Sequence, residues 1–434
     1  MRIVETLKTT EEGIEAKLNQ ILNRSSFDDP EQVSAVQEIW ENVQARGDEA
    51  ILEYNARFDG AKMEAEELEV GPAEIEAAYN KIEDSFLEAI REAIKNVGEF
   101  HKKQLRESWM DFKEDGVILG QKFTALERVG IYVPGGRAAY PSSVVMNGVP
   151  AKVAGVEEIV MVSPPDQDGA LNPYTLVAAA EVGVDKIYKV GGAQSIAGLS
   201  FGTGMIPQVD KIVGPGNIYV TLAKKLAFGY VDIDMLAGPS EVLVLADETA
   251  NPRFVAADLL SQAEHDPMAS AILVTTSEQL AEQVEQELSK QLKELSRAGI
   301  AGEALENYGA IIIAQNLAEA IELTNQFAPE HLEVAVDDPF AILGRLKNAG
   351  AIFLGEYAAE PVGDYIAGPN HVLPTGGSAR FYSPLNVDDF IKKSSIISYS
   401  KEGLEKVKDD ALEIARVEGL DAHANSIKVR FEEE

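Results

Sequence analysis

Residues 186–217 decide the fold class, and they read KIYKVGGAQSIAGLSFGTGMIPQVDKIVGPGN. An apolar run ends at Gly191-Gly192, a helix-like stretch follows, and a second apolar run ends at Gly214-Pro215-Gly216. Strands, glycine turns and helices in alternation are typical of parallel β-α-β units. The tetrapeptide VDKI precedes both turns, so we interpret the two positions as equivalent points of successive units.

Similar units extend in both directions along the chain. Upstream, apolar runs end at Pro134-Gly135-Gly136 and at Ser163-Pro164-Pro165. Downstream, five further strands are predicted at 241–245, 272–275, 310–313, 332–336 and 352–354, most of them separated by helical stretches. The pattern predicts two parallel α/β units in tandem. No G-x-G-x-x-G follows these strands, so the glycines could be plain turn residues.

The two ends of the chain differ from this middle part. Residues 31–58 and 72–107 have apolar residues at helical spacing, and the first of these segments lies between Asp29-Pro30 and Gly60. Near the C-terminus, SIKVRF at 426–431 alternates in polarity and predicts a short strand.

Composition excludes several classes of protein. The 434 residues include 38 Lys+Arg and 72 Asp+Glu, a net charge of −34, which disfavours nucleic acid and anionic membranes as partners. Cysteine is absent, which excludes disulfides, thiolate metal sites and a cysteine nucleophile. The start, MRIVETLKTTEEGIEAKL, has no signal-peptide core, and no apolar run is long enough to span a membrane. We therefore expect a cytoplasmic protein.

Histidine is scarce, with five in the chain, so the context of each is informative. His265 ends a predicted helix, and Gln262 lies three residues earlier on the same face. An imidazole and an amide oxygen could form half of a metal site, although a lone Q-x-x-H is more often structural. His101 has no partner nearby in the sequence, and we interpret it as structural.

Three further segments pair carboxylates with imidazoles. Glu330 and His331 are adjacent before a predicted strand, where their side chains could serve one pocket as separate acids or bases. Asp364 and His371 lie in a glycine- and proline-rich loop, 355–378, in which Asp364 could be an oxygen ligand. Glu418 and His423 flank GLDA near the C-terminus. Any one of these pairs alone could equally be solvated.

Taken together, the segments resemble the histidinol dehydrogenase family. The resemblance covers residues 130–426 and rests on GIYVPGGRAAYPSSVVMNGVPAKVAGV, KVGGAQSIAGLSFGTG, VDKIVGPGNIYVTLAKK, DMLAGPSEVLVLAD, DLLSQAEHDP, FAPEHLEV, GDYIAGPNHVLPTGGSARF and GLDAHANS. It implies oxidation of L-histidinol by two NAD and water to L-histidine, the last step of histidine biosynthesis. It also implies incomplete Rossmann-like units of the aldehyde-dehydrogenase type.

The resemblance also implies roles for individual residues. One zinc ion per subunit would be held by Gln262, His265, Asp364 and His423, the last donated across a homodimer. His331 would be the base in both oxidations, and Glu330 would activate water on the aldehyde. The metal ligands and His331 would contact the substrate together with Ser240, His371 and Glu418. The NAD contacts would be Tyr132, Gln194 and Asn217, all at the glycine turns.

By the same resemblance, the chain divides into four parts. They are an N-terminal helical arm (1–27), a first α/β domain (28–125 plus 240–380), a second α/β domain with the NAD turns (126–239), and a C-terminal piece given to the partner subunit (381–434).

Other activities remain open from the residues alone. A relative acting on another alcohol, such as a sulfonated diol, would change the substrate contacts, whereas a zinc hydrolase would leave the glycine turns without a role. Because cysteine is absent, an aldehyde oxidation here would proceed through a hydrate and would need a base such as Glu330.

Overall fold

The computed structural model of the chain describes residues 3–10, 14–24, 28–135 and 139–432, so Gly136 of the first glycine turn lies outside the described residues. Contacts divide the chain into unit 1 (Met1–Gln104 and Leu126–Phe390) and unit 2 (Leu105–Ala125 and Ile391–Glu434). Among the described residues, no helix is both long enough and apolar enough to cross a membrane.

The first sheet of unit 1 consists of six parallel strands with helices between them. Their order is β1 (Glu5–Lys8), β11 (Ala310–Ile313), β10 (Ser270–Thr275), β9 (Glu241–Ala246), β12 (His331–Ala335) and β13 (Ala351–Leu354). The helices are α10 (Pro252–Ala263), α11 (Glu278–Gln291), α12 (Ala298–Tyr308), α13 (Leu317–Phe327), α14 (Pro339–Leu343) and α15 (Glu360–Tyr365). Every residue of β9 and β10 is buried, as is typical of parallel strands covered on both faces. The five strands predicted here are confirmed.

The edge strand β1 differs from the prediction, which made residues 1–27 a helical arm. α1 (Ile14–Leu22) is helical as expected, but Glu5–Lys8 pairs in parallel with β11. The sequence ETLK contains no apolar run, so the local pattern does not indicate a strand. The pairing depends on the open edge of β11, which lies about 300 residues further along the chain.

The second sheet of unit 1 is also parallel and has the order β6 (Lys186–Lys189), β5 (Glu158–Ser163), β4 (Arg128–Tyr132), β7 (Lys211–Val213), β8 (Asp232–Ile233). Its helices are α6 (Pro141–Ala154), α7 (Pro173–Val182), α8 (Gly192–Phe201) and α9 (Ile218–Ala227). The central strand β4 has β5 and β6 on one side and β7 and β8 on the other. The glycine turns after β4 and β7 therefore lie at carboxyl ends of strands beside the point where the order reverses, which is where such sheets bind ligands, and the turn after β6 lies at the same end of the edge strand. The tandem α/β prediction is confirmed.

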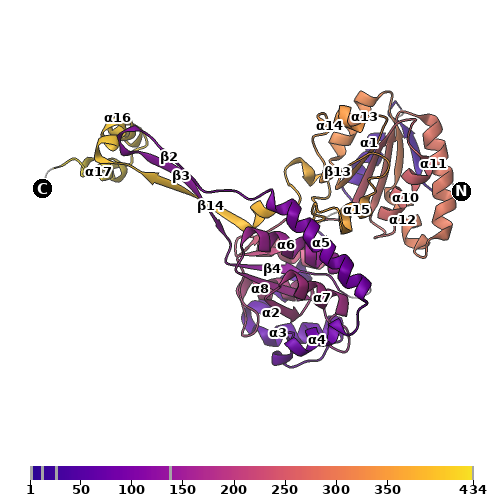
Figure 1. Ribbon diagram of the computed structural model, residues 1–434, viewed down its shortest axis with the longest axis horizontal. Coiled ribbons are helices and arrows are strands. Elements are labelled where there is room, and N and C mark those ends of the chain that lie inside the picture. Colours follow the sequence, from indigo (N-terminus) through magenta and orange to yellow (C-terminus); the bar gives the residue numbers. More distant parts are fainter. Residues whose placement is uncertain (1–2, 11–13, 25–27, 136–138, 433–434) are drawn as a thin grey trace. The chain divides into compact units, whose positions relative to one another are not determined.

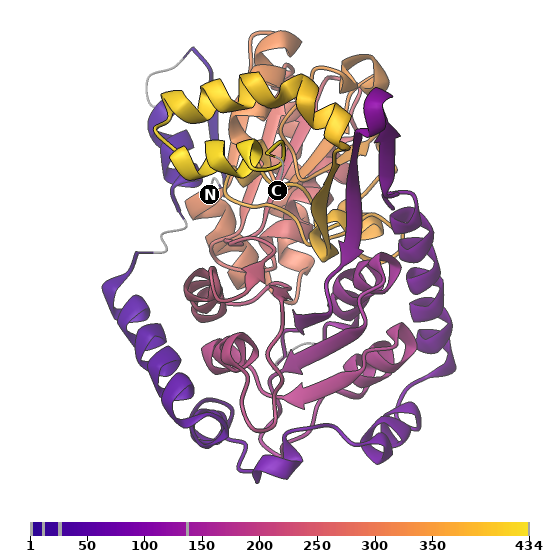
Figure 2. The same ribbon diagram turned by 90° about the vertical axis from the view of Figure 1, so that its left-hand side faces the viewer.

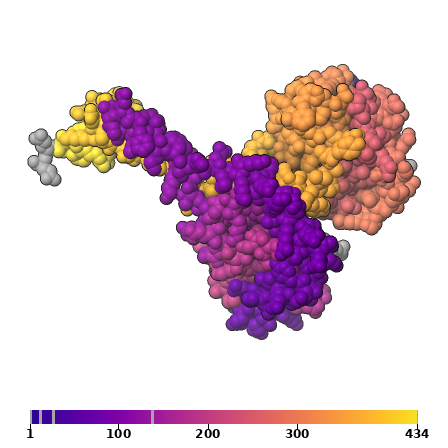
Figure 3. Space-filling model, viewed as in Figure 1, coloured from indigo at the N-terminus to yellow at the C-terminus, as the bar shows by residue number. Residues whose placement is uncertain are grey.

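The N-terminal helices cover the second sheet. They are α2 (Pro30–Arg46), α3 (Asp48–Tyr54), the π-helix η1 (Asn55–Asp59), α4 (Pro72–Tyr79) and α5 (Asp84–Lys102). Trp40 and Ile51 share an apolar core with Val160 and Ile212 of this sheet. In Figure 2 these indigo to violet helices lie on the outside of the magenta strands, and in Figure 3 their atoms form part of the surface next to the magenta atoms. The structure thus differs from the predicted grouping of 28–125 with 240–380, because the apolar faces of these helices pack on the other sheet.

Unit 2 is a small antiparallel sheet with two helices (Figure 1). The strand order is β14 (Ile391–Ser398), β3 (Ile118–Ala125), β2 (Trp109–Phe112), and the helices are α16 (Lys401–Val417) and α17 (Asp421–Lys428). The unit differs from the predicted C-terminal piece, since it begins at Ile391 and includes Leu105–Ala125. The strand predicted at 426–431 is wrong. Val429 N–H bonds to Asn425 O, so the helical hydrogen bonding continues through the alternating residues.

Candidate active site

The candidate active site lies at the amino-terminal edge of the first sheet. Glu330 and His331 stand at the start of β12, and Glu241 starts the neighbouring strand β9. The ladder between the two strands begins with His331 opposite Val242, so Glu241 stands one residue before the first pair. The backbone N–H and C=O of Glu241 are therefore contacted by the side chains of Glu330 and His331 rather than by the backbone of β12. Glu241 N–H donates to Glu330 Oε2 (2.9 Å), and His331 Nδ1 lies 3.1 Å from Glu241 O.

Glu241 is itself fixed by buried contacts. Its carboxylate accepts hydrogen bonds from Arg24 Nη2 (3.1 Å) and from the N–H of Gly376 (2.7 Å). The side chain of Arg24 is fully buried, and that of Glu241 is 7 % exposed. A buried and hydrogen-bonded ion pair of this kind resists displacement, because separating it would leave a charge without a partner. The pair therefore holds in place the one residue that orients both Glu330 and His331.

The contact with Glu241 sets the tautomer of His331. Because Nδ1 faces a carbonyl oxygen, Nδ1 carries the hydrogen and Nε2 points toward the carboxylates of Asp364 (3.8 Å) and Glu360 (3.9 Å). Burial lowers the pKa of His331, but the charges of Glu330 and Asp364 outweigh it and raise the pKa to about 10. At this pKa the ring is protonated at neutral pH, so His331 acts as a base only when a bound cation offsets the charge of these carboxylates. Nε2 is the atom of the ring that would then exchange a proton in the pocket.

Glu330 has the properties of a general base. Its side chain is buried, and burial raises its pKa to about 7, against the opposing charge of His331. A base is most effective when its pKa lies near the working pH. Glu330 and His331 therefore offer two proton acceptors from adjacent positions in the chain.

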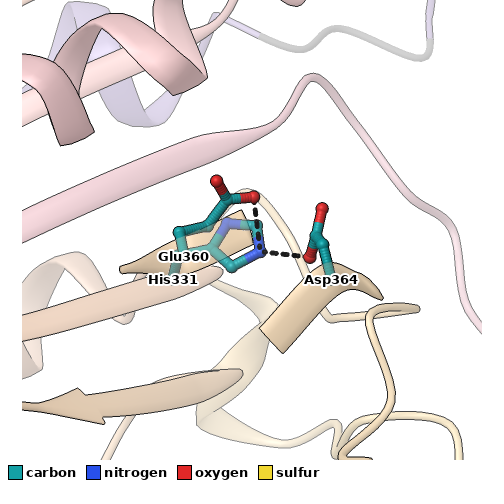
Figure 4. A group of neighbouring side chains, drawn as sticks. All are labelled: His331, Glu360 and Asp364. Atoms are coloured by element: carbon teal, nitrogen blue, oxygen red, sulfur yellow. Dashed lines mark ion pairs between the residues drawn. The ribbon is translucent and has the colours of Figure 1, made fainter. Parts of the chain in front are cut away.

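Asp364 and Glu360 lie on the same face of α15, four residues apart. Together with Nε2 of His331, their carboxylate oxygens lie within 4.8 Å of one another, close enough to share a metal ion (Figure 4). The pKa of Asp364 is lowered, because the hydrogen bond and charge of His331 outweigh the effect of burial. Burial and the charge of Asp364 raise the pKa of Glu360 to about 8. Asp364 is thus the ionised member of the pair.

Gln262 and His265 extend this group from the end of α10. Gln262 is buried, yet neither its Oε1 nor its Nε2 has a hydrogen-bond partner among the described residues. Burying an amide without partners is costly, so this side chain fits a site completed by another group. His265 follows the helix end and is exposed. Loss of water around part of its ring lowers its pKa, against the charge of Asp364, so the imidazole is neutral and able to bind metal at neutral pH.

The glycine turns of the second sheet form a separate polar cluster. Tyr132 ends β4, and its Oη accepts a hydrogen bond from Gly192 N–H (3.3 Å). Gly214 has φ +114°, and a Cβ there would lie 2.2 Å from Tyr132 O, so glycine is required for this approach. Asn217 caps α9 and accepts from the N–H groups of Tyr219 and Val220. The close backbone approach at Gly214 and the capped start of α9 fix the shape of these turns.

Comparison with known proteins identifies the family. A profile described as histidinol dehydrogenase matches residues 22–431. A histidinol dehydrogenase of Caldanaerobacter subterraneus subsp. tengcongensis is 57% identical over 99% of both chains, and one of Halalkalibacterium halodurans is 58% identical over 93% of this chain and 95% of its own. The crystal structure of histidinol dehydrogenase from Elizabethkingia anophelis has a TM-score of 0.94 at 38% identity, over 99% of this chain and 98% of that one. The chain belongs to the histidinol dehydrogenase family.

The structure of this family member brings most of the predicted residues near one another. Those assembled around the edge of the first sheet are Glu330, His331, Gln262, His265 and Asp364, with His371 Nδ1 3.1 Å from Asp364 O. Ser240 directly precedes β9, and its carbonyl oxygen accepts from Ser270 N–H. Glu418 and His423 lie in unit 2 and are exposed there. His101 is fully buried, with Nδ1 2.8 Å from Val97 O, in agreement with its structural interpretation.

Three residues of the candidate active site were not predicted from the sequence. Glu360 precedes Asp364 by four residues in a segment that looks like a loop, and the helical spacing is the signal that could have revealed it. Arg24 and Glu241 are far apart in the chain, and only the folded register brings them together.

Proposed function

We propose that the chain is a zinc-dependent histidinol dehydrogenase, which oxidises L-histidinol with two NAD and water to L-histidine and two NADH, the last step of histidine biosynthesis. The observation that carries the proposal is the attachment of Glu330 and His331 to the two backbone groups of Glu241. Each of the two oxidations and the hydration between them needs a positioned base, and these residues supply two bases in one pocket.

The metal would be held by Gln262, His265 and Asp364, with His423 of a second copy of the chain completing a homodimeric site. The unpartnered amide of Gln262 supports this assignment. His423 is exposed on α17, and Val417 and Leu420 beside it are 72% and 39% exposed, as expected for a surface that another copy covers. Two imidazoles, an amide oxygen and a carboxylate suit zinc without thiolate.

The side chains then have separate tasks. His331 Nε2 accepts the proton of the alcohol while hydride leaves the carbinol carbon, which gives the aldehyde. Glu330 accepts a proton from water as its oxygen adds to the aldehyde carbon, and His331 returns the alcohol proton to the carbonyl oxygen, which gives the hydrate and leaves His331 free to act as base again. His331 accepts a proton from the hydrate as the second hydride leaves, which gives the carboxylic acid. Ser240, His371 and Glu418 would contact the substrate.

When bound, NAD would accept the hydrides, and zinc would help to hold the substrate and would offset the charge of Asp364. The NAD contacts would be Tyr132, Gln194 and Asn217. Because the chain has no cysteine, the aldehyde is oxidised as its hydrate rather than as a thiohemiacetal.

The test is the yield of NADH per L-histidinol consumed, before chelation, after chelation and after zinc is returned. Two NADH per substrate, lost on chelation and restored by zinc, is the expected result. One NADH would mean that the natural substrate is another alcohol or that the reaction stops at an aldehyde. If no NADH formed while an ester or amide were hydrolysed, the chain would be a zinc hydrolase.

A further inference from the structure

Asp59 is a carboxylate without a partner in the part of the chain that covers the second sheet. It is the last residue of the π-helix η1, which follows α3. Short π-helical turns are frequent at functional sites, because the extra residue changes the direction in which side chains point. Asp59 lies outside both β-α-β units, so the rules for dinucleotide-binding folds do not predict a role for it.

The oxygen Oδ2 of Asp59 is buried and has no hydrogen-bond partner among the described residues. Burial raises the pKa of Asp59 to about 6, and no neighbouring cation opposes this rise. A buried acceptor without a donor is costly, and such groups are concentrated where a ligand supplies the missing partner.

The neighbours of Asp59 are the glycine-turn residues. Asn55, at the start of the same π-helix, accepts a hydrogen bond from Gln194 Nε2 (3.4 Å) and donates to Lys189 O (2.8 Å). Gln194 is buried, and its Oε1 likewise has no partner among the described residues. Burial raises the pKa of Tyr132 to about 12, and the charge of Asp59 adds to this rise. One unpartnered acceptor thus follows the turn after β6, and the other lies on the π-helix that is hydrogen-bonded to it through Asn55.

Acceptors of this kind need a ligand that donates. In dinucleotide-binding folds, a carboxylate at the end of the second strand accepts from the 2′-hydroxyl of the adenosine ribose. Here the second strand of the sheet, β5, ends at Ser163-Pro164-Pro165. The first acid after it, Asp166, is exposed, and its Oδ1 accepts hydrogen bonds from Asp168 N–H and Ala170 N–H. The carboxylate at the usual position is therefore partly engaged within its own loop.

We propose that Asp59 replaces that carboxylate and accepts hydrogen bonds from the adenosine ribose diol of NAD, and that it thereby selects NAD over NADP. The inference rests on the proposed use of NAD. A 2′-phosphate would bring negative charge against the carboxylate, so binding of NADP is disfavoured.

The test is calorimetric binding of NAD, NADP and 2′-deoxyadenosine NAD to the zinc-loaded protein. The variants are Asp59→Asn, and Asp168→Asn as a control that removes one charge from an exposed residue of the same unit. Asp59→Asn should weaken NAD at least about 10-fold, since hydrogen bonds to charged groups are among the strong ones. It should weaken binding of the 2′-deoxy analogue less than binding of NAD, because that analogue has already lost one of the two hydroxyls, and it should reduce the difference in affinity between NAD and NADP. Asp168→Asn should leave all three affinities as they are in the unchanged protein.

Two further readouts separate a ligand-binding role from a structural one. The melting temperature of Asp59→Asn without NAD should not fall, because the change removes an unpaired buried charge. If Asp59→Asn binds NAD as the unchanged protein does, or if the unchanged protein binds NAD and its 2′-deoxy analogue equally, the inference is overturned. The second comparison needs no variant and so stands even if Asp59→Asn does not fold. If the unchanged protein neither binds NAD nor forms NADH, the proposed function fails as well.

Discussion

Replacing Glu330 by Gln should separate the two oxidations. The amide oxygen of Gln can still accept the hydrogen bond that Glu241 N–H donates to Glu330 Oε2 (2.9 Å), so the start of β12 keeps its anchor. The amide cannot accept a proton from water at neutral pH. A positioned general base contributes about 10²–10⁴-fold, so the hydration step should slow by this factor, which corresponds to about 3–5 kcal/mol. Formation of the aldehyde depends on His331 and should fall less than about 10-fold.

The pH dependence gives an independent check of the same residue. Glu330 acts as a base only when ionised, and burial raises its pKa to about 7. The rate of the second oxidation in the unchanged protein should therefore rise with pH through about 7 and level off above it. In Glu330→Gln this rise should disappear, whereas Glu356→Gln, which removes an exposed carboxylate of the same unit, should keep it.

The assay is rapid-mixing measurement of NADH, with L-histidinol as the substrate in one series and histidinaldehyde in the other, and with product analysis by chromatography. Glu330→Gln should release one NADH per histidinol quickly and the second slowly. Equal loss of both steps, or an unchanged pH profile for the aldehyde series, would refute the assignment of Glu330 as the base for water.

Three further changes test the metal site, the positioning of the bases and the shared site. Gln262→Met should lower zinc affinity at least about 10-fold, measured by metal content after dialysis. It should not lower the melting temperature, because it removes two unpartnered polar atoms. Normal zinc content would remove Gln262 from the ligand set. Arg24→Met should lower the free energy of unfolding in urea by about 3–5 kcal/mol, because Glu241 would remain buried without its cation; a loss below about 1 kcal/mol would show that the pair does not hold Glu241. His423→Asn and His331→Asn should each abolish activity, and mixing the two proteins under conditions of verified subunit exchange should restore part of it; no restoration would contradict a site shared between two copies.

The sequence predicted the parts of the fold that local pattern determines. Each predicted strand of the two sheets lies within about two residues of an observed one, because buried parallel strands are short apolar runs bounded by glycine, proline or helices. The Asp29 cap and the Gly60 stop also follow from local backbone chemistry. Two of the errors of pattern, at Glu5–Lys8 and at 426–431, are short segments whose state depends on distant neighbours, and the strands β2, β3, β8 and β14 were not predicted. A strand of four residues needs an existing edge, and a six-residue alternation cannot be distinguished from the end of a helix.

The candidate site was less predictable, because its geometry depends on register. The local sequence identified His331 and Glu330 as candidates, but it could not show that both contact Glu241 at the start of the neighbouring strand β9. It also could not show which imidazole nitrogen is free, since that depends on Glu241 O. The role of Arg24 could not be predicted for the same reason. An arginine after a helix has no recognisable partner in the sequence, and only the fold places it beside the buried Glu241.

The attachment of both bases to Glu241 has a mechanistic consequence. Glu330 and His331 bind the N–H and the C=O of one residue, so a movement of β9 relative to β12 displaces both bases together. The aldehyde formed with one base would then remain in register with the other, which favours completion of the second oxidation before release. The buried contacts of the Glu241 carboxylate with Arg24 and Gly376 oppose such movement. Weakening them should therefore increase the escape of aldehyde per turnover more than it changes substrate binding, because most of the proposed substrate contacts lie at other positions of the pocket.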